Sequence, residues 1–211
     1  FKIEHVKDSR GNQQDYFINA TMMRIDLDEP LEPGDSYSFN IKWWYNINDR
    51  SKIGGRSGFE YFEAEDNYLY TIAQFFPRMA VYNDVEGWQN KQFLGRGEFA
   101  LVFGDYDVEI TVPEDHIVAA TGVLQNASSV LTSTQRSRWE KAQNADQPVF
   151  IVTEEEAITK EEKHEKGLNT WHFEAVNVRD FAFASSRKFI WDAMAVQQPS
   201  GKKVMAMSFY P

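Results

Sequence analysis

A period-two alternation of apolar and polar residues most constrains the fold of this chain. Tyr37, Phe39, Ile41 and Trp43 occur at every second position, and residues 23–27 repeat the pattern. Successive side chains of a β-strand point to opposite faces, so this spacing places the apolar side chains on one buried face. Aromatic residues make up 15% of the chain, and flat rings pack well on a pleated sheet surface. We therefore expect an all-β fold of antiparallel sheets.

Turn-forming residues divide the chain into strands. The run EPLEPGD at 29–35 predicts a hairpin between its flanking strands, and QQPSG at 197–201 predicts another. We find no boundary between domains, and we treat 1–211 as a single β domain. Because the first residues already show a strand pattern, we expect this domain to be truncated at its N-terminus. The expected strands cover 1–5, 16–27, 36–46, 59–63, 68–74, 98–103, 106–112, 117–124, 169–175, 181–185, 188–196 and 202–209.

Residues 126–168 differ in character and are interpreted as a polar, partly helical insertion. Residues 134–144 are polar helix formers, which predicts a short helix. Thr153 and Glu156 have the T-x-x-E spacing of a capping box, which predicts that a charged helix or loop covers 153–166. The fold class is thus all-β with one or two short helices in an insertion.

Composition excludes several classes of partner and site. The net charge of −10, without a cluster of Lys or Arg, argues against nucleic-acid binding because phosphates would be repelled. The chain has no cysteine, so it has no disulfide and no thiolate ligand. No run of 18 apolar residues occurs, so no membrane span is expected.

We expect no catalytic residue and no metal ligand in this chain. His164-Glu165 begins like the HExxH helix of a zinc site, but Leu168 occupies the position that requires the second histidine. The acidic run DYDVE at 105–109 lacks the glycine and distal glutamate of an EF-hand calcium loop. No spacing pairs the four histidines as ligands: His5, His116, His164 and His172.

Residues 68–104 resemble a segment of the zinc aminopeptidases of the aminopeptidase N type, within the gluzincin family. A more specific pattern is V-P…A-T-G-x-L at 112–124 followed by W-x-F-x-A…V-x-D-F-A-x-A at 171–184. The resemblance spans most of residues 20–196 and suits the bacterial branch of the family. The Gly-x-Met-Glu-Asn and HExxH motifs of the catalytic domain do not occur in the chain.

The resemblance implies a saddle-shaped N-terminal β domain that serves as a non-catalytic scaffold. Such a domain caps the peptide-binding cleft and packs on the catalytic domain, which holds the zinc ion and removes N-terminal residues from the peptide substrate. Gln74 matches a family glutamine that faces the substrate, whereas Phe76 stands where the family has an acid that holds the substrate's α-amino group. The implied substrate-binding residues are Gln74 and Phe76. The bacterial branch suggests a periplasmic or cell-envelope location.

A second hypothesis is a stand-alone β-sandwich module that binds carbohydrate or peptide on exposed aromatic side chains. The candidates are Trp43, Trp44, Tyr45 and Trp88. Since Trp43 and Trp44 are adjacent, they face opposite sides of a strand. A solvent-exposed aromatic stripe would favour this module, and a bare apolar face around 74–82 would favour the scaffold.

Overall fold

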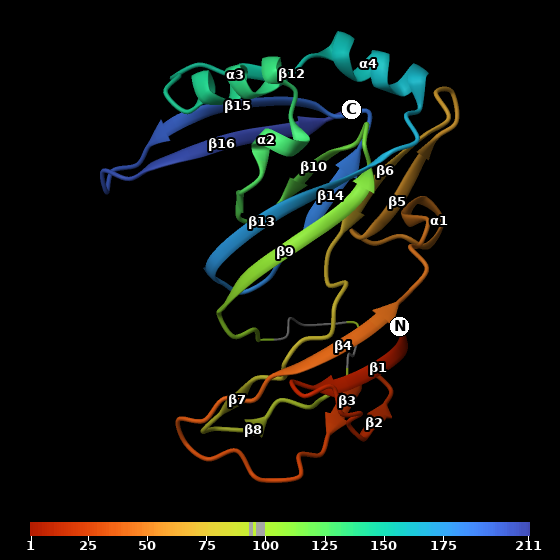
Figure 1. Ribbon diagram of the computed structural model, residues 1–211, viewed down its shortest axis with the longest axis vertical. Coiled ribbons are helices and arrows are strands. Elements are labelled where there is room, and N and C mark those ends of the chain that lie inside the picture. Colours follow the sequence, from red (N-terminus) through yellow and green to blue (C-terminus); the bar gives the residue numbers. More distant parts are fainter. Residues whose placement is uncertain (93–94, 96–99) are drawn as a thin grey trace. The chain divides into compact units, whose positions relative to one another are not determined.

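The computed structural model describes residues 1–92, 95 and 100–211 (Figure 1). Strands account for 43% of the chain and helices for 14%, and every strand pair is antiparallel, so the predicted all-β class is confirmed. The chain divides into two compact units, which we describe separately. Unit 1 comprises Phe1–Ile47 and Arg78–Val102, and unit 2 comprises Asn48–Pro77 and Phe103–Pro211. The assignment of residues 1–211 to one domain stays a prediction.

The described residues of unit 1 form three two-stranded sheets. They pair β1 (Lys2–Asp8) with β4 (Phe39–Trp44), β2 (Tyr16–Asn19) with β3 (Met22–Ile25), and β7 (Tyr82–Asn83) with β8 (Gly87–Trp88). The hairpin predicted at 29–35 is wrong, because β3 pairs with β2 and β4 pairs with β1. The expected strand at 98–103 lies partly outside the described residues, and residues 100–103 form no strand.

Unit 1 buries little apolar surface. Val6 is the single apolar side chain that is fully buried among the described residues of this unit. Two-stranded sheets are marginally stable in water unless further strands or a packed face support them. Apolar burial within unit 1 therefore contributes little to its stability.

Unit 2 contains three antiparallel sheets. The first has the order β10 (Ile117–Ala120), β14 (Phe183–Ser186), β6 (Asn67–Ile72) and β5 (Gly58–Phe62). The second has the order β11 (Val123–Leu124), β13 (Leu168–Val178) and β9 (Gly104–Pro113), and the third β12 (Val149–Val152), β15 (Ile190–Gln197) and β16 (Lys203–Tyr210). The predicted hairpin at 197–201 is confirmed, because it joins the paired strands β15 and β16.

The inner faces of these sheets form one hydrophobic core. β9 and β13 pair from Leu168 opposite Pro113 to Val178 opposite Gly104. Their alternate side chains point into the core, whose largest fully buried members include Trp171, Phe181 and Ile117. The side chains at the intervening positions point to the outer face of the same two strands, where polar side chains lie.

The predicted insertion is partly helical, and α3 and α4 lie beside the third sheet (Figure 1). Both helices begin with a capping box, formed at α4 by Thr153 and Glu156 as predicted and at α3 by Thr132 and Gln135. The sequence analysis missed β12, which pairs with β15. The helices are α1 (Arg50–Ile53), α2 (Ala127–Val130), α3 (Ser133–Ala142) and α4 (Glu154–Lys163).

The longest helices in the described part of the chain, α3 and α4, have ten residues each. No described helix is long and apolar enough to cross a membrane.

Candidate functional site

Gln74 lies just beyond the end of β6 and points away from the core of unit 2. The hydroxyl oxygen of Ser57 accepts a hydrogen bond of 3.1 Å from the backbone N–H of Ala73, which fixes the strand end. Gln74 follows with φ +53°, in the left-handed region that side-chain-bearing residues rarely adopt. Its side chain is exposed. An accessible amide suits a contact with a ligand, and the substrate-facing role of Gln74 stays a prediction.

Phe76 is partly buried and belongs to the periphery of the unit 2 core. Its ring meets the ring of Phe75 edge-on, with centroids 5.0 Å apart, and that of Tyr106 at 5.9 Å. Edge-to-face contacts at these distances stabilise aromatic packing. Packing thus explains the phenyl ring at this position, and its expected contact with substrate stays a prediction.

Residues 79–88 of unit 1 present large apolar side chains to solvent. Met79 is 59% exposed, Tyr82 64%, Val85 85% and Trp88 55%. The rings of Tyr82 and Trp88 meet edge-on across the β7–β8 hairpin, with centroids 5.3 Å apart. We call these four side chains the apolar hairpin surface. Contiguous apolar side chains on a surface indicate a site of contact with another molecule or segment, and the Tyr82–Trp88 pair is the contiguous part of this surface.

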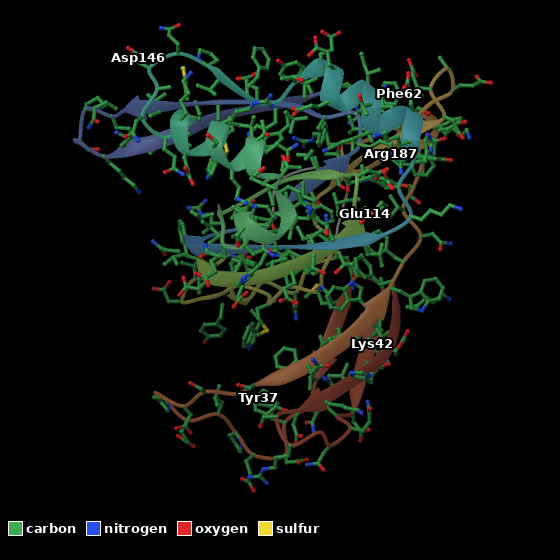
Figure 2. All side chains as sticks on the ribbon, turned by 45° about the horizontal axis from the view of Figure 1, so that its top comes forward. Tyr37, Lys42, Phe62, Glu114, Asp146 and Arg187 are labelled. Carbon is green, nitrogen blue, oxygen red and sulfur yellow. The ribbon has the colours of Figure 1, made fainter. Side chains whose placement is uncertain are left out.

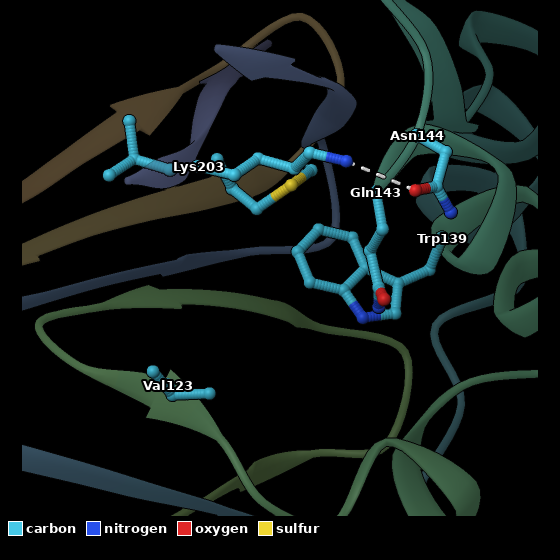
Figure 3. A pocket seen from close by; sticks show the side chains of 7 residues that line it. Val123, Trp139, Gln143, Asn144 and Lys203 are labelled. Carbon is cyan, nitrogen blue, oxygen red and sulfur yellow. Dashed lines mark hydrogen bonds between the residues drawn. The ribbon is translucent and has the colours of Figure 1, made fainter. Parts of the chain in front are cut away.

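A shallow hollow with a volume of about 460 Å³ lies between α3 and the edge of β16 in unit 2. Figure 3 shows Trp139 at its centre and the Lys203 ammonium donating a hydrogen bond of 3.2 Å to the Asn144 side-chain oxygen. Its lining is Val123, Trp139, Gln143, Asn144, Lys203, Val204 and Met205. No acid, histidine or cysteine lines it, so it lacks the usual metal ligands.

Arg187, labelled in Figure 2, is the centre of a buried polar network in unit 2. Its Nε donates to the Asp115 carboxylate at 3.0 Å, and its guanidinium also donates to the Asn67 side-chain oxygen at 2.9 Å. The Asp115 side chain is 1% exposed and accepts a further bond from the backbone N–H of Glu165. The network joins residues from four separate parts of the chain, and its burial indicates a structural role.

His116 is buried beside this network. Its Nδ1 lies 2.9 Å from the Ser185 hydroxyl oxygen. Burial, together with the positive charge of Arg187, lowers the pKa of His116 from 6.5 to about 4. Ser185 is 1% exposed and His116 4%, so this serine–histidine pair is closed to a substrate.

The outer face of β9 and β13 brings together a histidine and two carboxylates. His172 Nε2 lies 2.7 Å from an Asp107 carboxylate oxygen, and Glu174 stands directly opposite Asp107 in the strand register. One potential ligand atom from each of these three residues lies within 4.8 Å of the other two. We call these residues the sheet-face triad.

The other three histidines form no such group among the described residues. His164 is the left-handed residue that ends α4, so His164-Glu165 does not lie within a helix. His5 Nε2 lies 2.9 Å from the Asn40 side-chain oxygen. The structure therefore shows no HExxH-like arrangement in the part of the chain that it describes.

The sequence analysis did not connect the members of the sheet-face triad. Asp107 and His172 are 65 positions apart, and only the register of β9 against β13 places them side by side. The available signal was the alternation D-x-D-x-E at 105–109 and H-x-E at 172–174, which puts these side chains on one face of each strand.

No known protein family, curated protein or solved structure matches this chain.

Proposed function

We propose that this chain is the non-catalytic N-terminal β scaffold of a zinc metallo-aminopeptidase. In this role it caps the peptide-binding cleft and packs on a separate catalytic domain, which supplies the zinc ion. The sequence motifs at 112–124 and 171–184 are the starting point of the proposal, and the antiparallel β architecture agrees with it.

The apolar hairpin surface is the observation that carries the proposal. Its four side chains are each more than half exposed, although unit 1 has almost no buried apolar core. Covering apolar area stabilises a fold by about 25 cal/mol per Å². A scaffold domain that packs on further polypeptide would gain the apolar burial that unit 1 lacks in isolation.

The exposed side chain of Gln74 supports the same proposal from unit 2. A left-handed backbone at a residue other than glycine is costly, and such strain persists where the surroundings or the function require it. We assign to the Gln74 amide a hydrogen bond to the peptide substrate. We assign to the Phe76 ring an apolar contact with the substrate beside Gln74. This position holds no acid, and the Phe76 ring is only partly buried.

Hydroxyl-radical footprinting tests whether further polypeptide covers the apolar hairpin surface. The experiment compares this chain with the gene product that carries it together with a catalytic domain. We expect oxidation of Met79, Tyr82 and Trp88 to fall in the longer protein. Exposed Tyr61 and buried Trp171, both in unit 2, are the internal controls. Equal oxidation of the hairpin side chains in both proteins would contradict the proposal.

The second candidate is a stand-alone module that binds carbohydrate or peptide. Edge-on contact between the exposed rings of Tyr82 and Trp88 favours it, as does Trp44, which is 50% exposed. Trp43 is only partly buried, and Tyr45 packs against Phe1 with centroids 5.1 Å apart. Titrating the chain with oligosaccharides while following tryptophan fluorescence distinguishes this candidate. A saturable change that is absent in Trp88→Ala would favour the module over the scaffold.

A further inference from the structure

The outer face of β9 and β13 has a strong local excess of negative charge. Asp107 and Glu174 are opposite one another, and Glu109 stands opposite His172. Within the described residues, no lysine or arginine forms an ion pair with any of these three carboxylates. Carboxylates this close repel one another, and a bound cation relieves that repulsion.

The spacing of the sheet-face triad fits a single metal ion. Two ligands bound to one zinc ion in a tetrahedral shell at about 2.0–2.2 Å are ~3.3–3.5 Å apart. The His172 Nε2 to Asp107 oxygen distance is 2.7 Å, and one ligand atom of each triad residue lies within 4.8 Å of the others. The three atoms therefore already lie near the spacing that one ion requires, with the His172–Asp107 pair closer than the shell and no pair more than 4.8 Å apart.

The backbone around His172 is held firmly in place. The Asn126 side-chain oxygen accepts a hydrogen bond of 3.0 Å from the His172 N–H, and its amide group donates to the Thr170 carbonyl at 2.8 Å. The Gln125 N–H donates to the His172 carbonyl at 2.8 Å. Ligands on such a fixed strand lose little freedom when an ion binds, which favours affinity.

We propose that Asp107, His172 and Glu174 form a binding site for a divalent transition-metal ion, with zinc as the best match. Imidazole nitrogen together with carboxylate oxygen suits zinc and its transition-metal neighbours better than calcium or magnesium, which prefer oxygen alone. Because Asp107 and Glu174 are exposed, water completes the coordination shell. The site is independent of the scaffold function and of any zinc ion in a catalytic domain.

Isothermal titration of the EDTA-treated chain with zinc chloride, and separately with calcium chloride, tests this site. We expect one zinc ion per chain and much weaker binding of calcium. His172→Gln removes one ligand, and Glu174→Gln removes another at an exposed side chain. Each variant should weaken zinc binding by at least about 10-fold. Even the loss of a residue that only supports a metal ligand lowers metal affinity by this factor.

His5→Gln is the matched control, because it removes a histidine from unit 1 that belongs to no candidate metal group. It should leave the zinc affinity unchanged, and far-UV circular dichroism checks that each variant is folded. The proposal is overturned if the chain binds no zinc at a molar excess, if both ligand variants bind zinc like the wild type, or if calcium binds as tightly as zinc. The same titration tests the sequence prediction that this chain holds no metal.

Discussion

His116 makes the stability of unit 2 depend on pH in a defined window. Its side chain is 4% exposed, and burial lowers its pKa from 6.5 to about 4. Between these two values the unfolded state binds a proton that the folded state excludes. Stability contributed by neutral His116 is therefore complete above pH 6.5 and falls as the pH falls toward 4.

The magnitude follows from the displacement of the pKa. Lowering a pKa by one corresponds to 1.36 kcal/mol, so the change from 6.5 to about 4 corresponds to about 3 kcal/mol in the free energy of unfolding. Between pH 7 and pH 4.5 the linkage amounts to about 2 kcal/mol. That is a large fraction of the 5–15 kcal/mol that stabilises a typical domain.

Urea unfolding at pH 7 and pH 4.5, followed by tryptophan fluorescence, measures this effect. His116→Gln stays neutral at both pH values and keeps an amide that can bond to the Ser185 hydroxyl. We expect the loss of stability on acidification to be about 2 kcal/mol smaller in this variant than in the wild type. Comparing the two losses cancels the titration of groups elsewhere, and His5→Gln controls for removal of a histidine. Equal losses in His116→Gln and wild type would refute the reasoning.

Three further perturbations test other parts of the structure. Asp115→Ala leaves the Arg187 guanidinium buried without its carboxylate, and urea unfolding should show a loss of about 3–5 kcal/mol; a loss below about 1 kcal/mol would contradict burial of this pair. Gly122 has φ +95°, and the Cβ that Gly122→Ala introduces would collide with the Glu174 backbone. The melting temperature should therefore fall by several degrees or more. An unchanged melting temperature would show that β11 can shift. Gln74→Gly relieves the left-handed backbone and should stabilise unit 2 by about 1 kcal/mol. In the proposed longer aminopeptidase the same change should raise KM, and an unchanged KM would remove Gln74 from the proposed substrate site.

Local sequence patterns predicted the strands whose partners lie next to them in the chain. β5 with β6 and β15 with β16 are joined by short turns, and their alternation is visible without knowledge of the fold. The capping box at Thr153 and Glu156 is also local, since its two members are three positions apart in the chain. These features could be predicted because the interactions that determine them are short in sequence.

Features that depend on distant pairing could not be predicted in the same way. β1 pairs with β4 across some thirty intervening residues, and nothing local distinguishes this partner from a closer strand. The four-residue strand β12 consists of a short apolar run within a polar insertion, and only its contact with β15 defines it. Which strand becomes the partner of β1 or of β12 is decided by the tertiary structure and not by the local sequence.

The candidate sites show the same division. The exposed position of Gln74 depends on a left-handed backbone that glutamine does not signal, because side-chain-bearing residues rarely adopt it. The carboxylate of Asp115 meets Arg187 across 72 positions, and Asp107 meets His172 across 65. Asp107 belongs to an acidic run that is typical of solvated surface charge and is indeed exposed, and only the register of β9 against β13 reveals that it lies beside His172.

Hydrolysis of aminoacyl p-nitroanilide substrates tests the scaffold account most directly. The assay is run in parallel on this chain and on the gene product that carries it with a catalytic domain, each supplied with zinc. The account predicts that the longer protein releases the aromatic amine and that this chain releases none, even with zinc bound at the sheet-face triad. Cleavage by this chain alone, or no cleavage by the longer protein, would contradict it.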